Sequence, residues 1–346
     1  MNIAQKVAAL VRLGKYLGAN GEESGESKAD AWELNAWQAA KRKAYNINGW
    51  FTEEFIDLSV NNICRYFLQE EALQTWLLMY PQLGSPAVQQ TVGIVAAGNI
   101  PLVGFHDWMC GFLSGHKVRI KLSSKDETLM RHIIEKIAEW YPEAAELTSI
   151  EEILKGCDAY IATGSNNSAR YFEYYFSKYP HIIRRNRTSA AILTGEETEE
   201  ELNFLADDIM IYFGLGCRNV TKVFVPQGYN FEPLLKALGK YSYLADHHKY
   251  KNNYDYHLAL FLLNHDYYMS NSNILLHEHE SLFSPLSVLN YAFYEDAAAL
   301  TVELQQHPDL QCLVARNVTP FGHAQQPSLT DYADGVDTMH FLQALS

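Results

Sequence analysis

An alternation of short apolar runs and longer amphipathic stretches begins at Gln90 and constrains the fold of this chain more than any other feature. The short runs are rich in Val, Ile and Ala, as buried strands are, and the stretches between them place apolar residues at helical spacing. Units of strand, helix and strand build a parallel sheet with helices on both faces, and such sheets bind ligands at the carboxyl ends of their strands. The sequence therefore predicts an α/β fold.

The pattern defines eight strands and five helices, with further helical segments between Pro226 and Leu263. Before Gln90, apolar spacing predicts several amphipathic helices and a loop over Ala19–Ala29. The predicted strands are Thr91–Ala97, Lys117–Leu122, Ala159–Thr163, Ser189–Thr194, Thr221–Pro226, Asn273–His277, Leu286–Phe293 and Leu310–Ala315. The predicted helices are Pro101–Leu113, Glu127–Trp140, Ser168–Lys178, Thr198–Phe213 and one that starts at Glu295.

Length and charge narrow the class of protein. A chain of 346 residues favours two lobes over one. With 27 Lys and Arg against 41 Asp and Glu, the net charge of −14 argues against nucleic acid and anionic membranes as partners. No apolar stretch is long enough to span a bilayer, and the first segment interleaves Lys6, Arg12 and Lys15 with apolar residues, unlike a secretory signal. We expect a soluble, cytoplasmic protein.

The cysteines and the missing motifs exclude several common kinds of site. Five cysteines are widely spaced and form no CxxC pair, so we expect reduced thiols and no metal site. The GxGxxG, P-loop, GxSxG and HExxH motifs are all missing. A different set of residues must occupy the strand ends.

Four segments fill this gap, and their order and spacing resemble the aldehyde dehydrogenase superfamily over roughly residues 90 to 295. They are similar to its Asn-x-Pro turn, its Lys-Pro-Ser strand end, its Gly-Ser helix start and its cysteine loop with the strand that follows. Within the superfamily the chain most resembles the acyl-CoA reductases of the LuxC type, which supply fatty aldehydes in bacterial luminescence. The segments are AGNIP at 97–101, VRIKLSS at 118–124, ATGS at 162–165 and FGLGCRNVTKVFV at 213–225.

The resemblance implies an aldehyde dehydrogenase-like fold. We expect a helical N-terminal region and a Rossmann-type NAD(P)-binding domain in residues 1–186. An α/β catalytic domain with the cysteine would follow in 187–319, and a C-terminal arm in 320–346. The arm would return to the body of the chain or contact another subunit, and the family likeness implies a homo-oligomer.

Two residues are the predicted catalytic pair. Cys217 follows Gly214 and Gly216, so a glycine turn could expose its thiol and leave backbone N–H groups to hold an oxyanion. Its alternative is a buried, small apolar residue. The resemblance makes the Asn99 side chain an oxyanion donor, and the alternative for Asn99 is a helix N-cap before Pro101.

The cofactor residues come from the same resemblance. Gly98 and Lys121 are assigned to cofactor binding, with Lys121 reaching the adenosine ribose unless it is simply a solvated strand end. Ser124 and Lys125 stand where NAD users often carry an acid, which favours NADPH over NADH.

The nicotinamide half of the cofactor is assigned to two later segments. Gly164 and Ser165 begin a helix whose N-terminus attracts phosphate. Glu280 resembles the acid that holds the nicotinamide ribose.

An absence points to the substrate. No acid lies between His181 and Leu193, and Ile183 or Arg184 stands where hydrolytic members have their general base. An enzyme that hydrolyses its thioester needs that base, whereas one that passes the acyl group to a thiol needs it much less. CoA chemistry follows, unless His106 or Glu280 supplies a base or the site has decayed.

We therefore predict an NADPH-dependent reductase that converts an acyl-CoA, in particular a fatty acyl-CoA, to an aldehyde through acylated Cys217. The alternatives are an acyl-phosphate reductase resembling glutamate semialdehyde dehydrogenases, an inactive nucleotide-binding member, and an acyltransferase or thioesterase. A basic cluster of Arg184, Arg185 and Arg187 could meet the phosphates of CoA or NADP, or could be a solvated face.

Overall fold

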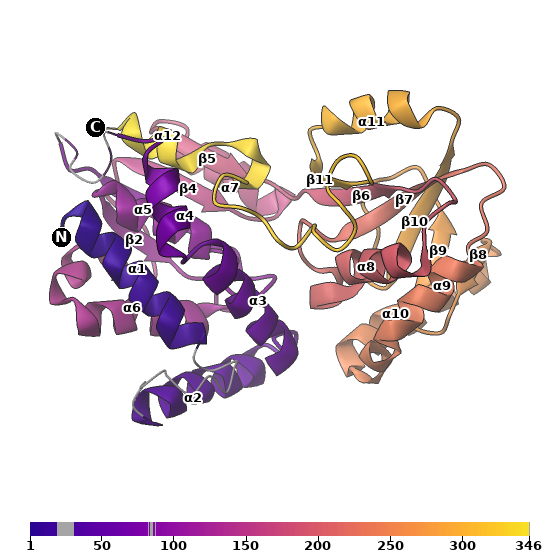
Figure 1. Cartoon of the computed structure of the whole chain (residues 1–346), viewed down its shortest axis with the longest axis horizontal. Helices are drawn as coiled ribbons and strands as arrows, with labels where there is room; N and C mark the ends of the chain where they lie inside the picture. Colours follow the sequence, from indigo (N-terminus) through magenta and orange to yellow (C-terminus); the bar gives the residue numbers. More distant parts are fainter. Residues whose placement is uncertain (19–30, 82, 84–85, 87, 346) are drawn as a thin grey trace. The chain divides into compact units, whose positions relative to one another are not determined.

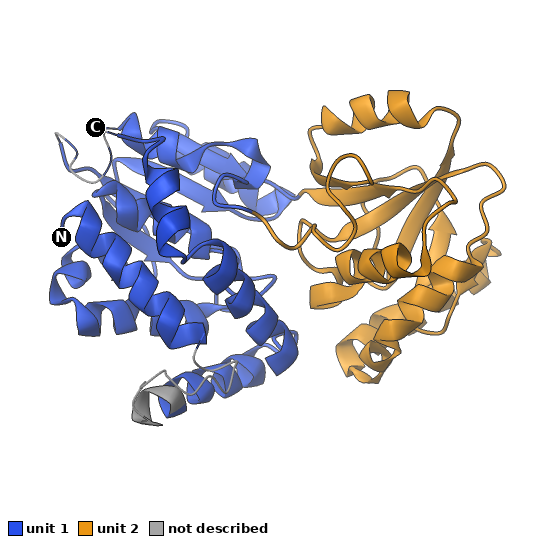
Figure 2. Cartoon of the chain, viewed as in Figure 1, with its two compact units in different colours: residues 1–186, 328–346 blue, residues 187–327 orange. Residues whose placement is uncertain are grey.

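The computed structural model describes residues 1–18, 31–81, 83, 86 and 88–345, so the predicted loop Ala19–Ala29 lies outside the described residues. The chain forms two compact units (Figures 1 and 2). Unit 1 comprises Met1–Asn186 and Ser328–Ser346, and unit 2 comprises Arg187–Pro327. The expected arm is thus divided, because residues 320–327 belong to unit 2 and the remainder to unit 1.

Unit 1 is built on a five-stranded parallel sheet in the order β3-β2-β1-β4-β5. The chain leaves β1 toward β2 and later returns to pair β4 with the other side of β1. This reversal is the topological switch point of a Rossmann-type sheet, and it lies between β1 and β4. The strands are β1 Thr91–Val95, β2 Lys117–Lys121, β3 Thr148–Ile150, β4 Ala159–Thr163 and β5 His181–Arg184.

Helices cover this sheet and share one large apolar core with it. Trp37, Trp108 and Phe112 are among its largest fully buried side chains. Four N-terminal helices confirm the amphipathic pattern read before Gln90. The helices of unit 1 are α1 Ile3–Gly18, α2 Ala31–Ile47, α3 Glu53–Tyr66, α4 Glu70–Leu77, α5 Phe105–Ser114, α6 Glu127–Trp140, α7 Asn166–Phe176 and α12 Thr338–Gln343, with 3-10 turns η1 Pro142–Glu146 and η4 Ala333–Gly335.

Unit 2 contains a six-stranded sheet in the order β11-β6-β7-β10-β9-β8, parallel except for the β8/β9 pair. Helices α8, α9 and α10 lie on one face and α11 on the other (Figure 1). The strands are β6 Thr188–Ile192, β7 Val220–Pro226, β8 Tyr268–Ser270, β9 Leu275–Glu278, β10 Val288–Tyr294 and β11 Leu310–Val314. The helices are α8 Glu199–Met210, α9 Glu232–Leu238, α10 His248–Asn264 and α11 Ala297–Gln305, with 3-10 turns η2 Ile211–Gly214 and η3 Gly239–Asp246.

The α/β prediction is confirmed, with one helix start corrected and three strands added. The helix predicted from Pro101 begins only at Phe105, because Leu102 takes a left-handed φ of 59° that an α-helix cannot contain. Strands β3 and β8 have three residues each, too few to show periodicity, and β5 lies in an arginine-rich segment. No helix among the described residues is long and apolar enough to cross a membrane.

Candidate active site

Six of the predicted site residues lie at the carboxyl edge of the unit 1 sheet, beside its switch point. They follow three neighbouring strands, β1, β2 and β4, which run parallel and in register. The side chains of Asn99, Lys121, Ser124 and Ser165 are exposed there, and Gly98 is buried. The six residues are Gly98 and Asn99 after β1, Lys121 and Ser124 at the end of β2, and Gly164 and Ser165 after β4.

The turn that carries Asn99 is held from two sides. Ser59 of α3 donates its hydroxyl to the Pro101 carbonyl at 2.7 Å, and the Asp126 carboxyl accepts the Leu102 N–H at 2.7 Å. Since the residue that precedes α5 is Gly104, the helix-cap alternative for Asn99 is wrong. The sequence alone does not single out Ser59 or Asp126, because both bond residues that are distant in the chain.

Gly98 is required by a close approach between two loops. A Cβ at this position would lie 2.4 Å from Ser123 Oγ, so a larger residue would push the β1 and β2 ends apart. Burial raises the pKa of the neighbouring Asp126 well above its usual range, while the bond from Leu102 opposes that shift. The loops that carry Asn99, Lys121 and Ser124 are therefore packed against one another.

Gly164 and Ser165 start α7, as predicted. Ser165 is the N-cap and its hydroxyl accepts the Ser168 N–H at 3.2 Å. A Cβ on Gly164 would lie 2.8 Å from Ser168 Cβ and 2.9 Å from the Phe172 ring. The Ser165 hydroxyl thus caps the helix. An anion at this turn would be bound by the backbone N–H groups at the helix N-terminus.

Cys217 is half-buried, on a turn between α8 and β7 in unit 2. Tyr212, Phe213 and Gly214 have positive φ values of 55°, 58° and 75°, a run that L-residues adopt only when their surroundings hold them. The glycine turn before Cys217 is present, but the Gly216 N–H is bonded within the turn, and the role of Cys217 as nucleophile stays a prediction.

One buried side chain, Asn219, ties this turn together. Its Oδ1 accepts the Gly216 N–H at 2.8 Å, and its Nδ2 donates to the Ile211 carbonyl at 2.8 Å and the Asp208 carbonyl at 3.2 Å. From β6, Ser189 donates its hydroxyl to the Cys217 carbonyl at 3.0 Å. Asn219 directly precedes β7, and an Asn between a glycine-rich turn and a strand is a sequence signal for such a bonding role.

The segment 320–327 is attached to the same turn. Asp208, at the end of α8, accepts the Gly322 N–H at 2.7 Å and the Ala324 N–H at 3.0 Å. Arg218, next to Cys217, donates to the Ala324 carbonyl at 3.3 Å. Burial raises the pKa of Asp208 to about 7, although the two backbone donors lower it. This part of the predicted arm therefore borders the cysteine.

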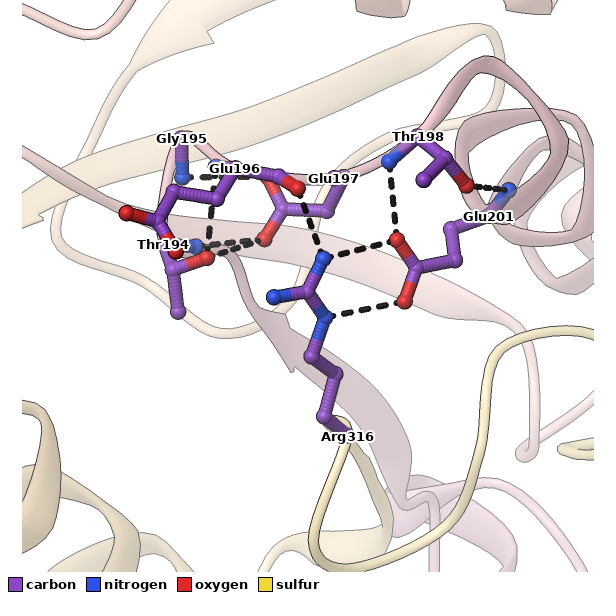
Figure 3. A network of polar contacts seen from close by, with 7 residues as sticks. All are labelled: Thr194, Gly195, Glu196, Glu197, Thr198, Glu201 and Arg316. Atoms are coloured by element: carbon purple, nitrogen blue, oxygen red, sulfur yellow. Dashed lines mark hydrogen bonds and ion pairs between the residues drawn. The ribbon is translucent and has the colours of Figure 1, made fainter.

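The other end of α8 is held by a polar network at the carboxyl edge of the sheet (Figure 3). Thr198 and Glu201 form a reciprocal capping box. Arg316, after β11, pairs with both carboxylate oxygens of Glu201 at 2.8 Å and donates to the Glu196 carbonyl at 2.7 Å. The Arg316 guanidinium lowers the pKa of Glu201 to about 2.

Glu280 lies two residues beyond β9 and its side chain is exposed. It belongs to unit 2 with Cys217. Asn99, the predicted oxyanion donor, and the other predicted cofactor residues belong to unit 1.

The predicted arginine cluster does not exist. Arg184 is buried against Asp107 and donates to Thr338 Oγ1 at 2.7 Å. Arg185 pairs with Glu173, and Arg187 donates to the Leu310 carbonyl at 3.2 Å. Arg184 is the last residue of β5, and Arg185 and Arg187 follow it outside the strand, so the three side chains have different partners.

His106, one of the two alternative bases, is committed to packing in unit 1. Its ring lies 5.1 Å from that of Phe67 and 5.4 Å from that of Tyr332, and its Nε2 lies 3.1 Å from the Leu329 carbonyl.

No family model and no curated protein matches this sequence. Solved structures of aldehyde dehydrogenases do match. The Bacillus cereus enzyme in its NAD+ complex is 13% identical with a TM-score of 0.60, covering 91% of this chain and 72% of its own. The NAD+ complex of the P. syringae indole-3-acetaldehyde dehydrogenase AldA is 13% identical with a TM-score of 0.58, covering 91% and 72%. The NAD-dependent enzyme of Sinorhizobium meliloti is 11% identical with a TM-score of 0.56, covering 87% and 68%.

At this level of identity the comparison establishes the fold. The chain has the α/β fold of the aldehyde dehydrogenases, with a Rossmann-like parallel sheet, as the sequence predicts.

Proposed function

We propose that this protein is an NADPH-dependent acyl-CoA reductase of the LuxC type, which converts an acyl-CoA, in particular a fatty acyl-CoA, to an aldehyde through an acyl-cysteine. The observation that carries the proposal is the half-buried Cys217 on a glycine turn held by Asn219 and Ser189. An aldehyde dehydrogenase fold that presents a cysteine on such a turn supports an NAD(P)-dependent oxidoreductase.

The carboxyl edge of the unit 1 sheet fits a dinucleotide. Doubly wound sheets bind nucleotides at their switch point, and here α7 directs its first amide groups to that edge. Lys121 adds a cation, and Ser124 with Lys125 suits a 2′-phosphate, which favours NADPH. The matched B. cereus and P. syringae enzymes were solved with NAD+, which supports a nicotinamide cofactor that would supply hydride.

In the proposed reaction the Cys217 sulfur attacks the thioester carbonyl carbon. In this proposal a backbone N–H of the cysteine turn would donate to the oxyanion that forms, and Asn99 keeps the donor role that the resemblance predicts. The bond from carbon to the CoA sulfur breaks, and CoA leaves as a thiol with the proton that the Cys217 thiol gave up. The cofactor, when bound, would supply hydride to the acyl carbon; the bond from that carbon to the Cys217 sulfur would then break as the carbonyl re-forms, so that the aldehyde would depart and the thiolate would take up a proton.

CoA rather than water is favoured as the exchange partner. The segment 181–193 contains no carboxylate, and the Arg184 that stands in it is neutralised by Asp107. With His106 committed to packing, no nearby residue predicted from sequence remains to activate water except Glu280.

The test is NADPH oxidation with a panel of acyl-CoA thioesters of increasing chain length. Wild type should consume NADPH only when a thioester is present, and Cys217→Ala should abolish the reaction while the circular dichroism spectrum is retained. Cys64→Ala is the matched control, since Cys64 is also half-buried but lies in unit 1, and it should keep its activity.

Other outcomes identify the alternatives. Activity with acyl phosphates and none with thioesters would replace this proposal with the acyl-phosphate reductase. Release of CoA without NADPH consumption would indicate an acyltransferase or thioesterase, and NADPH binding without any turnover an inactive member.

A further inference from the structure

The loop of unit 2 that contains residues 279–283 is bonded to the neighbouring sheet. Each of its five backbone carbonyls accepts a hydrogen bond from a side chain of β7 or β10. Lys222 Nζ donates to the carbonyls of residues 279 and 280, both at 2.7 Å. Asn290 Nδ2 donates to those of residues 281 and 283 at 3.0 and 3.1 Å, and Thr221 Oγ1 to that of residue 282 at 2.6 Å. Three side chains thus fix the path of the loop that contains Glu280.

The strand register explains why these three donors face the same loop. Lys222 of β7 and Asn290 of β10 are direct cross-strand partners. On its other side, β7 pairs with β6 through an irregularity that passes from Val220 to Lys222 and skips Thr221. Such a bulge turns an extra residue toward the face of its neighbour, so Thr221 and Lys222 can both bond the loop although they are adjacent in sequence.

Lys222 is the strongest of the three attachments. Its side chain is only 1% exposed, its charge makes both hydrogen bonds charge-assisted, and Nζ lies 4.9 Å from the centre of the Phe224 ring. Burial lowers the pKa of this amine to about 8, while Glu280 raises it. Lys222 is therefore shielded from solvent, and its amine donates to the carbonyl of Glu280 and to that of the residue before it.

We infer that Lys222 is a positioning residue, which sets the place of Glu280 and through it the binding of the nicotinamide ribose. The inference rests on the function proposed above and on the role that the family resemblance gives Glu280, which is to contact that ribose. Loss of Lys222 would leave two carbonyls without their donor and release the part of the loop that carries the carboxylate. A displacement of about 1 Å at a positioning group can cost on the order of a hundredfold in rate.

The experiment compares Lys222→Met, Glu280→Gln and the double variant with wild type, using NADPH as the probe. Each single variant should raise the Kd for NADPH by roughly tenfold. The double variant should be no weaker than Glu280→Gln alone, because Lys222 acts through Glu280. Lys236→Met, an exposed lysine of the same unit, is the matched control and should bind as wild type does.

Hydrogen exchange gives a readout that does not depend on activity. In Lys222→Met the amides of residues 279–283 should exchange faster, while those around Cys217 keep their protection. Should that variant fail to fold, Thr221→Val removes one neutral donor and should produce a smaller change at the same loop.

The outcomes separate the inference from the proposed function. Unchanged exchange in the loop, or additive effects in the double variant, would overturn the role of Lys222 even if the enzyme reduces acyl-CoA. Wild-type protein that binds no NADPH would instead overturn the proposed function, and faster exchange in the loop would then still support Lys222 as its anchor.

Discussion

At the scale of single residues, Asn219 explains how a short cysteine turn keeps a conformation that its own sequence disfavours. Tyr212, Phe213 and Gly214 take left-handed dihedrals in succession, which costs free energy at the two non-glycine residues. The Asn219 amide, fully buried, offsets that cost by bonding backbone groups on both sides of the turn. The placement of Cys217 is therefore maintained by a residue that takes no part in the chemistry proposed for it.

Replacing Asn219 by Ala should lower both stability and turnover. The lost bonds leave buried backbone groups unpaired, at a cost of about 2 to 4 kcal/mol in the free energy of unfolding. The kcat should fall even at temperatures where the variant is fully folded, because the turn that carries Cys217 loses its fixed conformation. Urea denaturation, kcat and the rate of Cys217 alkylation, measured by mass spectrometry, check this together.

The buried Asn273 is the matched control for Asn219. Its Nδ2 donates to the Leu238 carbonyl at 3.2 Å, away from the cysteine turn. Asn273→Ala should cost stability and leave Cys217 alkylation unchanged. An alkylation rate in Asn219→Ala equal to that of wild type would contradict the positioning role.

At the scale of elements, α8 links the two edges of the unit 2 sheet. Its start is fixed by the capping box and Arg316, and its end carries Asp208 and the carbonyls that Asn219 bonds. Helix ends leave amide and carbonyl groups unpaired, and here both ends obtain partners distant in sequence. A displacement of the start of α8 can thus shift the cysteine turn, because the helix moves as a rigid body.

The Glu201–Arg316 pair makes this anchorage dependent on pH. The pKa of Glu201 is lowered from its ordinary 4.5 to about 2, so the folded state favours the ionised carboxylate. The stabilisation is fully present above about pH 4.5 and is lost as the pH falls toward 2. Arg316→Ala should be less stable than wild type near neutral pH, and the difference should vanish in acid.

Urea midpoints measured from neutral to acid pH check that window. Lys236→Ala, which breaks the exposed pair with Glu199, is the control and should change the midpoint little at any pH. A difference between Arg316→Ala and wild type that persists unchanged in acid would rule out the pair as its cause.

At the scale of the whole molecule, the chain leaves unit 1 at Asn186 and returns to it at Ser328. The returning segment buries Met339 and Leu342 completely. Its Tyr332 hydroxyl lies 3.0 Å from Trp76 Nε1 and 2.7 Å from the Tyr80 hydroxyl. The last residues are therefore part of the unit 1 core, although unit 2 separates them from it in sequence.

A chain that ends at Pro327 should lose stability in unit 1 and keep it in unit 2. Each fully buried large apolar side chain that is removed contributes about 1.5 to 3 kcal/mol, so the loss should amount to several kcal/mol. Hydrogen exchange resolved by unit is the measurement. Thr330→Ala, at an exposed position of the same segment, should change neither unit, and equal destabilisation of both units by the truncation would contradict the assignment.

Local pattern sufficed for much of the fold and part of the site. Periodicity and turn residues act over a few neighbours, so α6 and β4 begin and end where the sequence predicts. Parallel strands bring their carboxyl ends to one edge, which is why Gly98, Lys121 and Gly164 could be placed together from order alone.

What depends on partners far along the chain was decided only by the tertiary structure. The charge on Arg184 is neutralised by Asp107, and the phosphate role suggested by its arginine neighbours disappears. Asn99 is positioned by Ser59 and Asp126 rather than by a helix, because Leu102 interrupts the expected first turn. Sequence by itself determined the kind of fold, since that follows from local periodicity, and it singled out the candidate nucleophile through the order of four segments that resemble the aldehyde dehydrogenase superfamily. The contacts that hold the nucleophile and its neighbours required the folded chain, because hydrogen bonds and ion pairs depend on distances in space.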